Sequence, residues 1–201
     1  SQRMINIMIL AAADSNKTDS QEDYPLCLNE IDGESLLECI VNKTSGLETP
    51  KYVFTFLGDD VERFHLDRVA SLLSPNNLVV KMAKGSQGAA CSGLYSACQL
   101  DQNSELLIIS ANELVNVDYQ SVISDFRKRK LDAGTITFRS LHPRYSYVRL
   151  DSEGYVIETT QHNPITKKAT AGVFWFRKTS YFVEAVKKQI LKNASTNGKF
   201  Y

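Results

Sequence analysis

Short apolar runs alternate with amphipathic segments through the first two thirds of this chain, and that alternation constrains the fold more than any other feature. Four runs rich in apolar, β-branched and aromatic residues are predicted to be strands, and the first of them is nearly continuous in its apolar residues, which is typical of a strand buried on both faces of a sheet. They lie at 4–13, 51–57, 77–82 and 106–110. The segments between them carry apolar residues at helical spacing, at 34–43, 59–73, 86–99 and 118–129. Such alternation predicts a three-layer α/β domain with a mostly parallel sheet.

Two helix starts are predicted in these segments. Asp59 or Asp60 is placed to cap the second helix, and Ser86 to open the third.

Further strand-like runs follow with only short polar gaps between them. They cover 133–138, 145–150, 154–160 and 170–176, and a last helix is predicted over 180–191. A hairpin turn at 152–154 joins two of the strands, so we expect this part of the sheet to be antiparallel. We therefore expect one domain over 1–201, with a mixed, mostly parallel sheet and antiparallel strands added in the second half. The chain stops soon after the last helix with no helix-stop signal, so its C-terminal end is expected to be incomplete.

The charge composition excludes one class of partner. Lys plus Arg and Asp plus Glu both number 23, so the chain lacks the general positive field that drives non-specific nucleic-acid binding. No run of 18 apolar residues occurs, so no membrane span is expected. The cysteines lack metal-type spacing, and we interpret them as reduced core residues of a cytoplasmic protein. They are Cys27, Cys39, Cys91 and Cys98. Composition leaves the oligomeric state open.

A basic run, Arg127 to Lys130, falls at the predicted C-terminus of the helix over 118–129. Cations stabilise this end of a helix because they interact favourably with its dipole. We interpret the run as a solvated helix end, with phosphate binding as the alternative.

Small and polar residues follow several predicted strands, at the edge where an open α/β sheet binds its ligands. Gly85 and Gly88 flank the predicted start of a helix, where they let a ligand approach free backbone N–H groups. The amide of Gln87 has the donor and the acceptor that read a nucleobase. Tight packing of the helix on the sheet, with Ser86 as an ordinary N-cap, is the alternative interpretation of the spacing.

Five segments carry a resemblance to a known family. They read YPLCLNEIDGESLLECIV, KGSQGAACSGLYSA, LLIISANELVNVDY, DAGTITFRSLHPRYSYVRLDSEGYVIET and ATAGVFWFRK. In this order they resemble the sugar-phosphate nucleotidyltransferases, in particular the small ones found with capsule and surface-polysaccharide genes. The resemblance implies the Rossmann-like fold of nucleotide-diphosphosugar transferases (GT-A type). It also implies transfer of a nucleotidyl group from a nucleoside triphosphate to a sugar phosphate, with release of pyrophosphate and help from Mg²⁺.

The resemblance places the contacts to the nucleotide. The glycine-rich turn of the family falls on Ala11, Ala12 and Ala13, and only Lys17 could replace its arginine. The lysine of the second motif is absent, because the chain reads Pro-Leu-Cys-Leu over 25–28. The base pocket falls on Gly85, Gln87 and Gly88.

The resemblance also places the metal and the sugar phosphate. The metal-holding aspartate falls on Asn112, with Glu113 beside it. Asn112 offers a neutral oxygen without the charge that gives Mg²⁺ its affinity, and Glu113 would supply that charge. His162 and Lys167 fall in the segment that grips the sugar phosphate.

The motif for the base is kept, and the motifs for the phosphates and the metal are altered. Three functions fit this pattern. The first is a nucleotidyltransferase of surface-polysaccharide biosynthesis. The second is a glycosyltransferase of the same fold that uses a nucleotide sugar already made. The third is a catalytically degenerate module that binds a nucleotide or a sugar phosphate without turnover.

Overall fold

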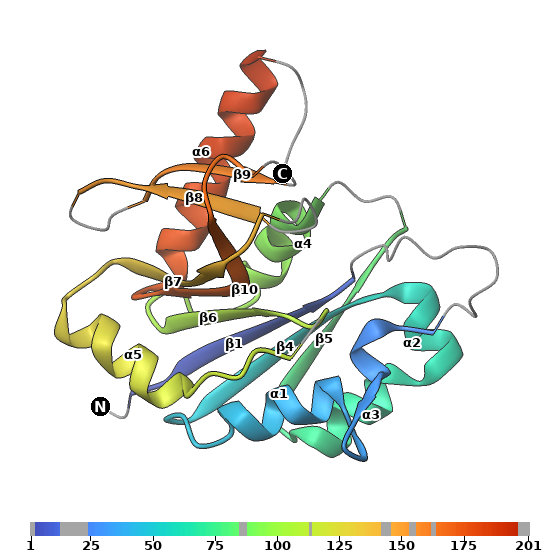
Figure 1. Cartoon of the computed structure of the whole chain (residues 1–201). Coiled ribbons are helices and arrows are strands. Elements are labelled where there is room, and N and C mark those ends of the chain that lie inside the picture. The colour runs from blue at the N-terminus through green and yellow to red at the C-terminus, as the bar shows by residue number, and fades with distance from the viewer. Residues whose placement is uncertain are drawn as a thin grey trace.

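A mixed eight-stranded sheet forms the centre of the protein (Figure 1). The structure is a computed structural model that describes residues 3–12, 24–84, 88–112, 114–141, 146–152, 156–161 and 164–196. The strand order is β5-β4-β1-β6-β10-β8-β9, and β7 pairs with β10 off this path.

The parallel part of the sheet comes from the four consecutive apolar runs. Its strands are β1 (Ile5–Ala11), β4 (Pro50–Leu57), β5 (Asn77–Met82) and β6 (Glu105–Ser110). β1 lies between β4 and β6 and is parallel to both, and β5 extends the sheet beyond β4. The predicted α/β fold with a mostly parallel sheet is confirmed.

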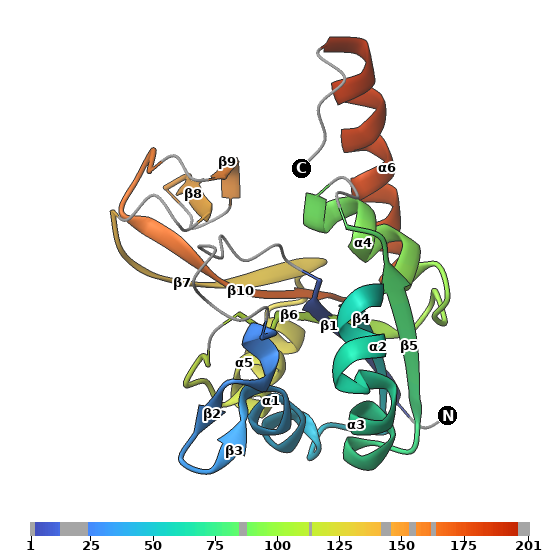
Figure 2. The ribbon, with the colours of Figure 1, turned by 90° about the vertical axis from the view of Figure 1, so that its right-hand side faces the viewer.

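Helices cover both faces of this sheet (Figures 1 and 2). One face carries α1 (Leu36–Thr44), α2 (Gly58–Phe64), α3 (Leu66–Leu73) and α5 (Tyr119–Lys128). The other carries α4 (Gly88–Ala97) and α6 (Thr179–Thr196). Ile7 and Ile9 of β1 are buried under the first layer and Met8 under the second. Successive side chains of a strand point to opposite faces, so a strand covered on both sides is largely apolar. The polar exception in β1 is Asn6, whose buried amide donates to the carbonyl of Asp101 and the hydroxyl of Thr179.

The antiparallel part of the sheet is organised around one long strand, β10 (Lys168–Phe176). β7 (Ala133–Arg139) and β8 (Ser146–Leu150) pair with it, and β9 (Val156–Gln161) pairs with β8. β7 runs along one edge of β10 at both of its ends. The other edge is shared, since 173–176 pair with β6 and Ala169 pairs with β8. The register between β10 and β7 shifts between Thr170 and Phe174, and Gly172 in this stretch has a φ of +71°.

One predicted helix is in fact two. The segment 59–73 is divided into α2 and α3 by His65, which has a left-handed φ of 53°. Neither Asp59 nor Asp60 is the cap, because the N-cap is Leu57 and both aspartates lie in the first turn of α2. Their charge still suits the helix N-terminus, where the dipole favours anions.

A short hairpin before α1 was not predicted. It joins β2 (Glu30–Ile31) to β3 (Glu34–Ser35), after a 3₁₀ turn over Leu26–Leu28. Asp32 and Gly33 form its turn with φ values of 52° and 87°, the two positive values that a type I′ turn requires.

The burial of the cysteines agrees with the prediction only in part. Cys27 is buried, but Cys98 is exposed, so Cys98 is not the core residue that was expected. The predicted roles of Ser86 and of the turn at 153–154 lie outside the described residues. Within the part of the chain that the structure describes, no helix has both the length and the apolar character that a membrane crossing requires.

Candidate functional site

The candidate site lies at the edge of the sheet where the parallel strands end. Ala11, the last residue of β1, pairs with Phe56 of β4. On the other side, the N–H of Ala111 donates to the carbonyl of Leu10 over 2.9 Å, so β1 and β6 end at the same level. Open α/β sheets bind ligands beyond such strand ends.

Small residues line this edge. Ala11 and Ala12 are half-buried, and Ala111 is fully buried. Gly172 approaches Ser110 so closely that a Cβ at Gly172 would lie 2.9 Å from the Cβ of Ser110. Ala11 and Ala12 are thus partly exposed at the end of β1, whereas Ala111 and Gly172 are packed against their neighbours.

The predicted site residues divide between those at this edge and those apart from it. Asn112 comes two residues after the end of β6 and is exposed, so it shares the edge with Ala11 and Ala12. Gly88 begins α4. Lys167 is exposed and comes just before β10, where its carbonyl accepts from the N–H of Ser140. The remaining predicted residues, Ala13, Lys17, Gly85, Gln87, Glu113 and His162, lie outside the described residues.

The described residues do not fit a magnesium ion at this edge. Asn112 offers a single neutral oxygen, whereas Mg²⁺ favours carboxylates. Among the described residues, no three His, Cys, Asp or Glu side chains come close enough to hold a metal ion. No step proposed below passes through a metal.

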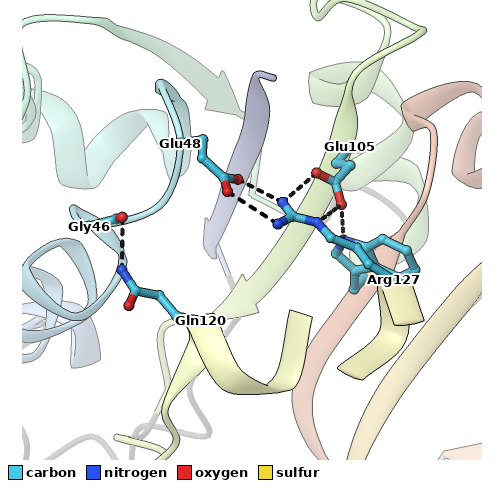
Figure 3. Close-up of polar contacts among 6 residues, drawn as sticks. Gly46, Glu48, Glu105, Gln120 and Arg127 are labelled. Atoms are coloured by element: carbon cyan, nitrogen blue, oxygen red, sulfur yellow. Dashed lines mark hydrogen bonds and ion pairs between the residues drawn. The ribbon is translucent and has the colours of Figure 1, made fainter. Parts of the chain in front are cut away.

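A polar cluster that was not predicted occupies the opposite edge of the sheet, where β6 begins (Figure 3). Arg127 of α5 lies between two carboxylates and donates to Glu105 over 2.6 and 2.9 Å and to Glu48 over 2.8 and 3.3 Å. The indole Nε1 of Trp175 donates to Glu105 over 3.1 Å. Beside this cluster, the amide of Gln120 donates to the carbonyl of Gly46 over 2.8 Å. The sequence suggested that Arg127 belongs to a solvated helix end. The structure instead holds its side chain between two carboxylates.

The electrostatics of the cluster follow from this geometry. The hydrogen bonds that Arg127 donates to the Glu105 carboxylate raise the pKa of Arg127, so its charge is secure at any ordinary pH. The hydrogen bond from Arg127 lowers the pKa of the Glu48 carboxyl below its usual value.

Glu48→Gln tests this linkage through pH. The lowered pKa means that the ion pair stabilises the fold above the unfolded pKa of about 4.3, and that this contribution is lost as pH falls through the folded pKa. Because the Glu48 side chain is 52% exposed, we expect no more than about 1 kcal/mol. Urea unfolding should show the variant less stable than the parent at pH 7 and nearly equal to it in acid. A difference that persists unchanged in acid would contradict the assignment.

Comparison with known proteins supports the fold. No family model and no curated protein matches the chain. Solved structures do match, among them the nucleoside-diphosphate-sugar pyrophosphorylase from Vibrio cholerae RC9, with 16% identity and a TM-score of 0.70 over 97% of this chain and 83% of that one. A Bacillus anthracis protein assigned as a glucose-1-phosphate thymidylyltransferase matches with 14% identity and a TM-score of 0.71, over 92% of this chain and 75% of that one. The mannose-6-phosphate isomerase from Helicobacter pylori matches with 13% identity and a TM-score of 0.70, over 96% and 77%. The chain has the fold of these three proteins.

The likeness stops at the fold. Identities of 13 to 16% over nearly the whole chain establish the arrangement of strands and helices. The names of these proteins include a pyrophosphorylase, a thymidylyltransferase and an isomerase, so the fold by itself does not fix a reaction.

Proposed function

We propose that this chain is a nucleotidyltransferase-like protein of surface-polysaccharide biosynthesis, acting in the cytoplasm on a nucleoside triphosphate and a sugar phosphate. The observation that carries the proposal is the edge of small residues where β1 and β6 end together, beside Gly172. The three similar structures support it, because each of their names contains a sugar phosphate or a nucleotide sugar.

The proposed reaction requires little covalent chemistry from the protein. A phosphate oxygen of the sugar phosphate attacks the α-phosphorus of the triphosphate, the bond from the α-phosphorus to the bridging oxygen breaks, and pyrophosphate leaves with that electron pair. Catalysis of this kind consists mainly of positioning and of charge neutralisation. We assign Gln87 to the base and Lys17 to the phosphates, and His162 and Lys167 to the sugar phosphate.

A second candidate is a binding module without turnover. It is favoured by Asn112, an exposed neutral amide at the position where the resemblance implies a metal-holding aspartate. Such a protein would keep the small-residue edge and bind a nucleotide or a sugar phosphate there.

Pyrophosphate release decides between the candidates. We expect release from one of ATP, CTP, GTP and UTP in the presence of a hexose 1-phosphate. Gln87→Ala should lower kcat/KM by about 10- to 30-fold, because it removes two hydrogen bonds worth about 1 kcal/mol each. Gln99→Ala is the matched control, since Gln99 is exposed just beyond the other end of α4 and should leave the rate unchanged.

Thermal melting with the same ligands completes the test. A ligand at a hundred times its Kd stabilises a protein by about 2.7 kcal/mol. A shift without pyrophosphate release would establish the binding module. Neither a shift nor release with any pair of substrates, in folded protein, would reject both candidates.

A further inference from the structure

A cavity of about 800 Å³ lies at the edge of the sheet where the parallel strands begin. It is lined by Met4 just before β1, Glu105 at the start of β6, Leu131 after α5 and Trp175 near the end of β10. Glu105 and Ser110 are the two ends of β6, so this cavity is roughly 17 Å from the small-residue edge. Its volume is in the range of sites for small molecules.

The walls of the cavity are predominantly basic. The charged side chains of the lining are four cations and two anions: Arg3, Arg127, Lys130 and Arg177, with Asp101 and Glu105. Since the whole chain has as many acidic as basic residues, such a convergence from four separate parts of the chain is not a consequence of composition.

The four cations of the lining differ in whether they already form an ion pair within the protein. Arg127 is held by Glu48 and Glu105, and Arg177 donates to Asp132 over 2.7 Å. Within the described parts of the chain, the side chains of Arg3 and Lys130 make no hydrogen bond or ion pair. The charge of Arg3 helps to lower the pKa of the Glu48 carboxyl, so Lys130 is the cation of the lining whose charge is least used, and Arg3 is the second.

Lys130 also has a backbone conformation that is unfavourable for a residue with a side chain. Its N–H donates to the carbonyl of Arg127, and the next N–H, of Leu131, donates to Phe126, which closes α5 in a Schellman motif. Lys130 has a φ of 54°, at the position where helices usually place glycine. A side chain with this conformational cost beside a cavity indicates that the side chain itself has a use.

We propose that this cavity binds a small phosphorylated metabolite, with Lys130 and Arg3 holding the phosphate. The apolar walls from Met4 and Leu131 would contact the organic part of the ligand. This site is separate from the small-residue edge and does not depend on the function proposed for that edge.

The fluorescence of Trp175 reports binding directly, because it is the only tryptophan of the chain and lines the cavity. The probes are inorganic phosphate and glucose 6-phosphate, with glucose at matched ionic strength as the uncharged control. We expect a saturable change with the phosphorylated sugar and none with glucose.

Lys130→Gly separates the role of the side chain from that of the backbone. The variant should melt at a higher temperature than the parent without ligand, because glycine relieves the left-handed conformation. It should also bind glucose 6-phosphate at least about tenfold more weakly, the loss expected for one charge-assisted hydrogen bond. Lys130→Arg should keep binding, and Lys188→Ala, which removes a charge on the exposed side of α6, should change neither property.

Two results would overturn the proposal. One is the absence of a saturable response to either phosphate probe up to about 10 mM, where a site of millimolar Kd would be mostly filled. The other is equal affinity in Lys130→Gly and the parent.

Discussion

Arg127→Met should lower the free energy of unfolding by about 3–5 kcal/mol, the loss measured when one partner of a buried ion pair is removed. The variant leaves Glu105, which is only 8% exposed, without the guanidinium that binds both of its carboxylate oxygens. The single hydrogen bond that remains, from Trp175, cannot compensate a full charge. Chemical denaturation at pH 7 would measure the change.

Two controls isolate the buried charge as the cause. Arg129→Met removes a cation from the same helix end, but its pair with Asp125 is exposed on both sides and should be worth no more than about 0.5 kcal/mol. Glu105→Gln in the Arg127→Met background removes the uncompensated charge and keeps an acceptor for Trp175, so it should recover part of the loss. Equal costs for Arg127→Met and Arg129→Met would show that the cluster contributes nothing beyond surface charge.

Gly172→Ala should destabilise the protein by about 2–5 kcal/mol. One part of this cost is conformational, about 1–2 kcal/mol for a side chain at a left-handed φ, here +71°. The other part is steric, because the new methyl group would lie 2.9 Å from the Cβ of Ser110, and overpacking of this kind costs about 1–3 kcal/mol. The melting temperature should fall accordingly.

Gly33→Ala is the matched control for the conformational part. Gly33 also has a positive φ, of +87°, but a Cβ there would meet nothing within 4 Å. Its cost should therefore be the conformational part alone, about 1–2 kcal/mol. Removing the Cβ of Ser110 in a Ser110→Gly, Gly172→Ala double variant should return the steric part, which a double-mutant cycle would measure. If Gly172→Ala costs no more than Gly33→Ala, the close approach at the bulge is not a tight contact.

The parallel sheet could be predicted because its strands are rich in apolar residues, and most of β1, β4 and β6 is apolar on both faces, a pattern that can be seen without knowing which strands pair. The break at His65 could not, since helical spacing continues through 59–73 and a left-handed histidine has no local signal. The hairpin at 30–35 did have one, the Asp32-Gly33 pair, and sequence reasoning overlooked it.

The two edges of the sheet also differ in how far their residues could be placed from the sequence. Ala11 and Asn112 could be placed from sequence, because they follow strands whose ends are easy to locate. The basic cavity could not, since its cations come from residue 3, the end of α5 and the end of β10, and only the folded sheet brings them together. For the same reason Arg127 was predicted to be solvated: its partner Glu48 lies 79 positions away in the sequence, and only the fold brings the two together.

The position of β10 in the sheet has a consequence for synthesis on the ribosome. The four parallel strands are complete once Ser110 has emerged, but the outer edge of β6 stays open until Phe176, roughly 65 residues later. At ribosomal rates of 5–20 residues per second, this interval is about 3–13 s. During that time the nascent chain presents an unpaired strand edge whose four central residues, 106–109, are apolar, and such an edge can pair with other chains. Translation speed between these two points should therefore govern how much of the protein reaches the native state.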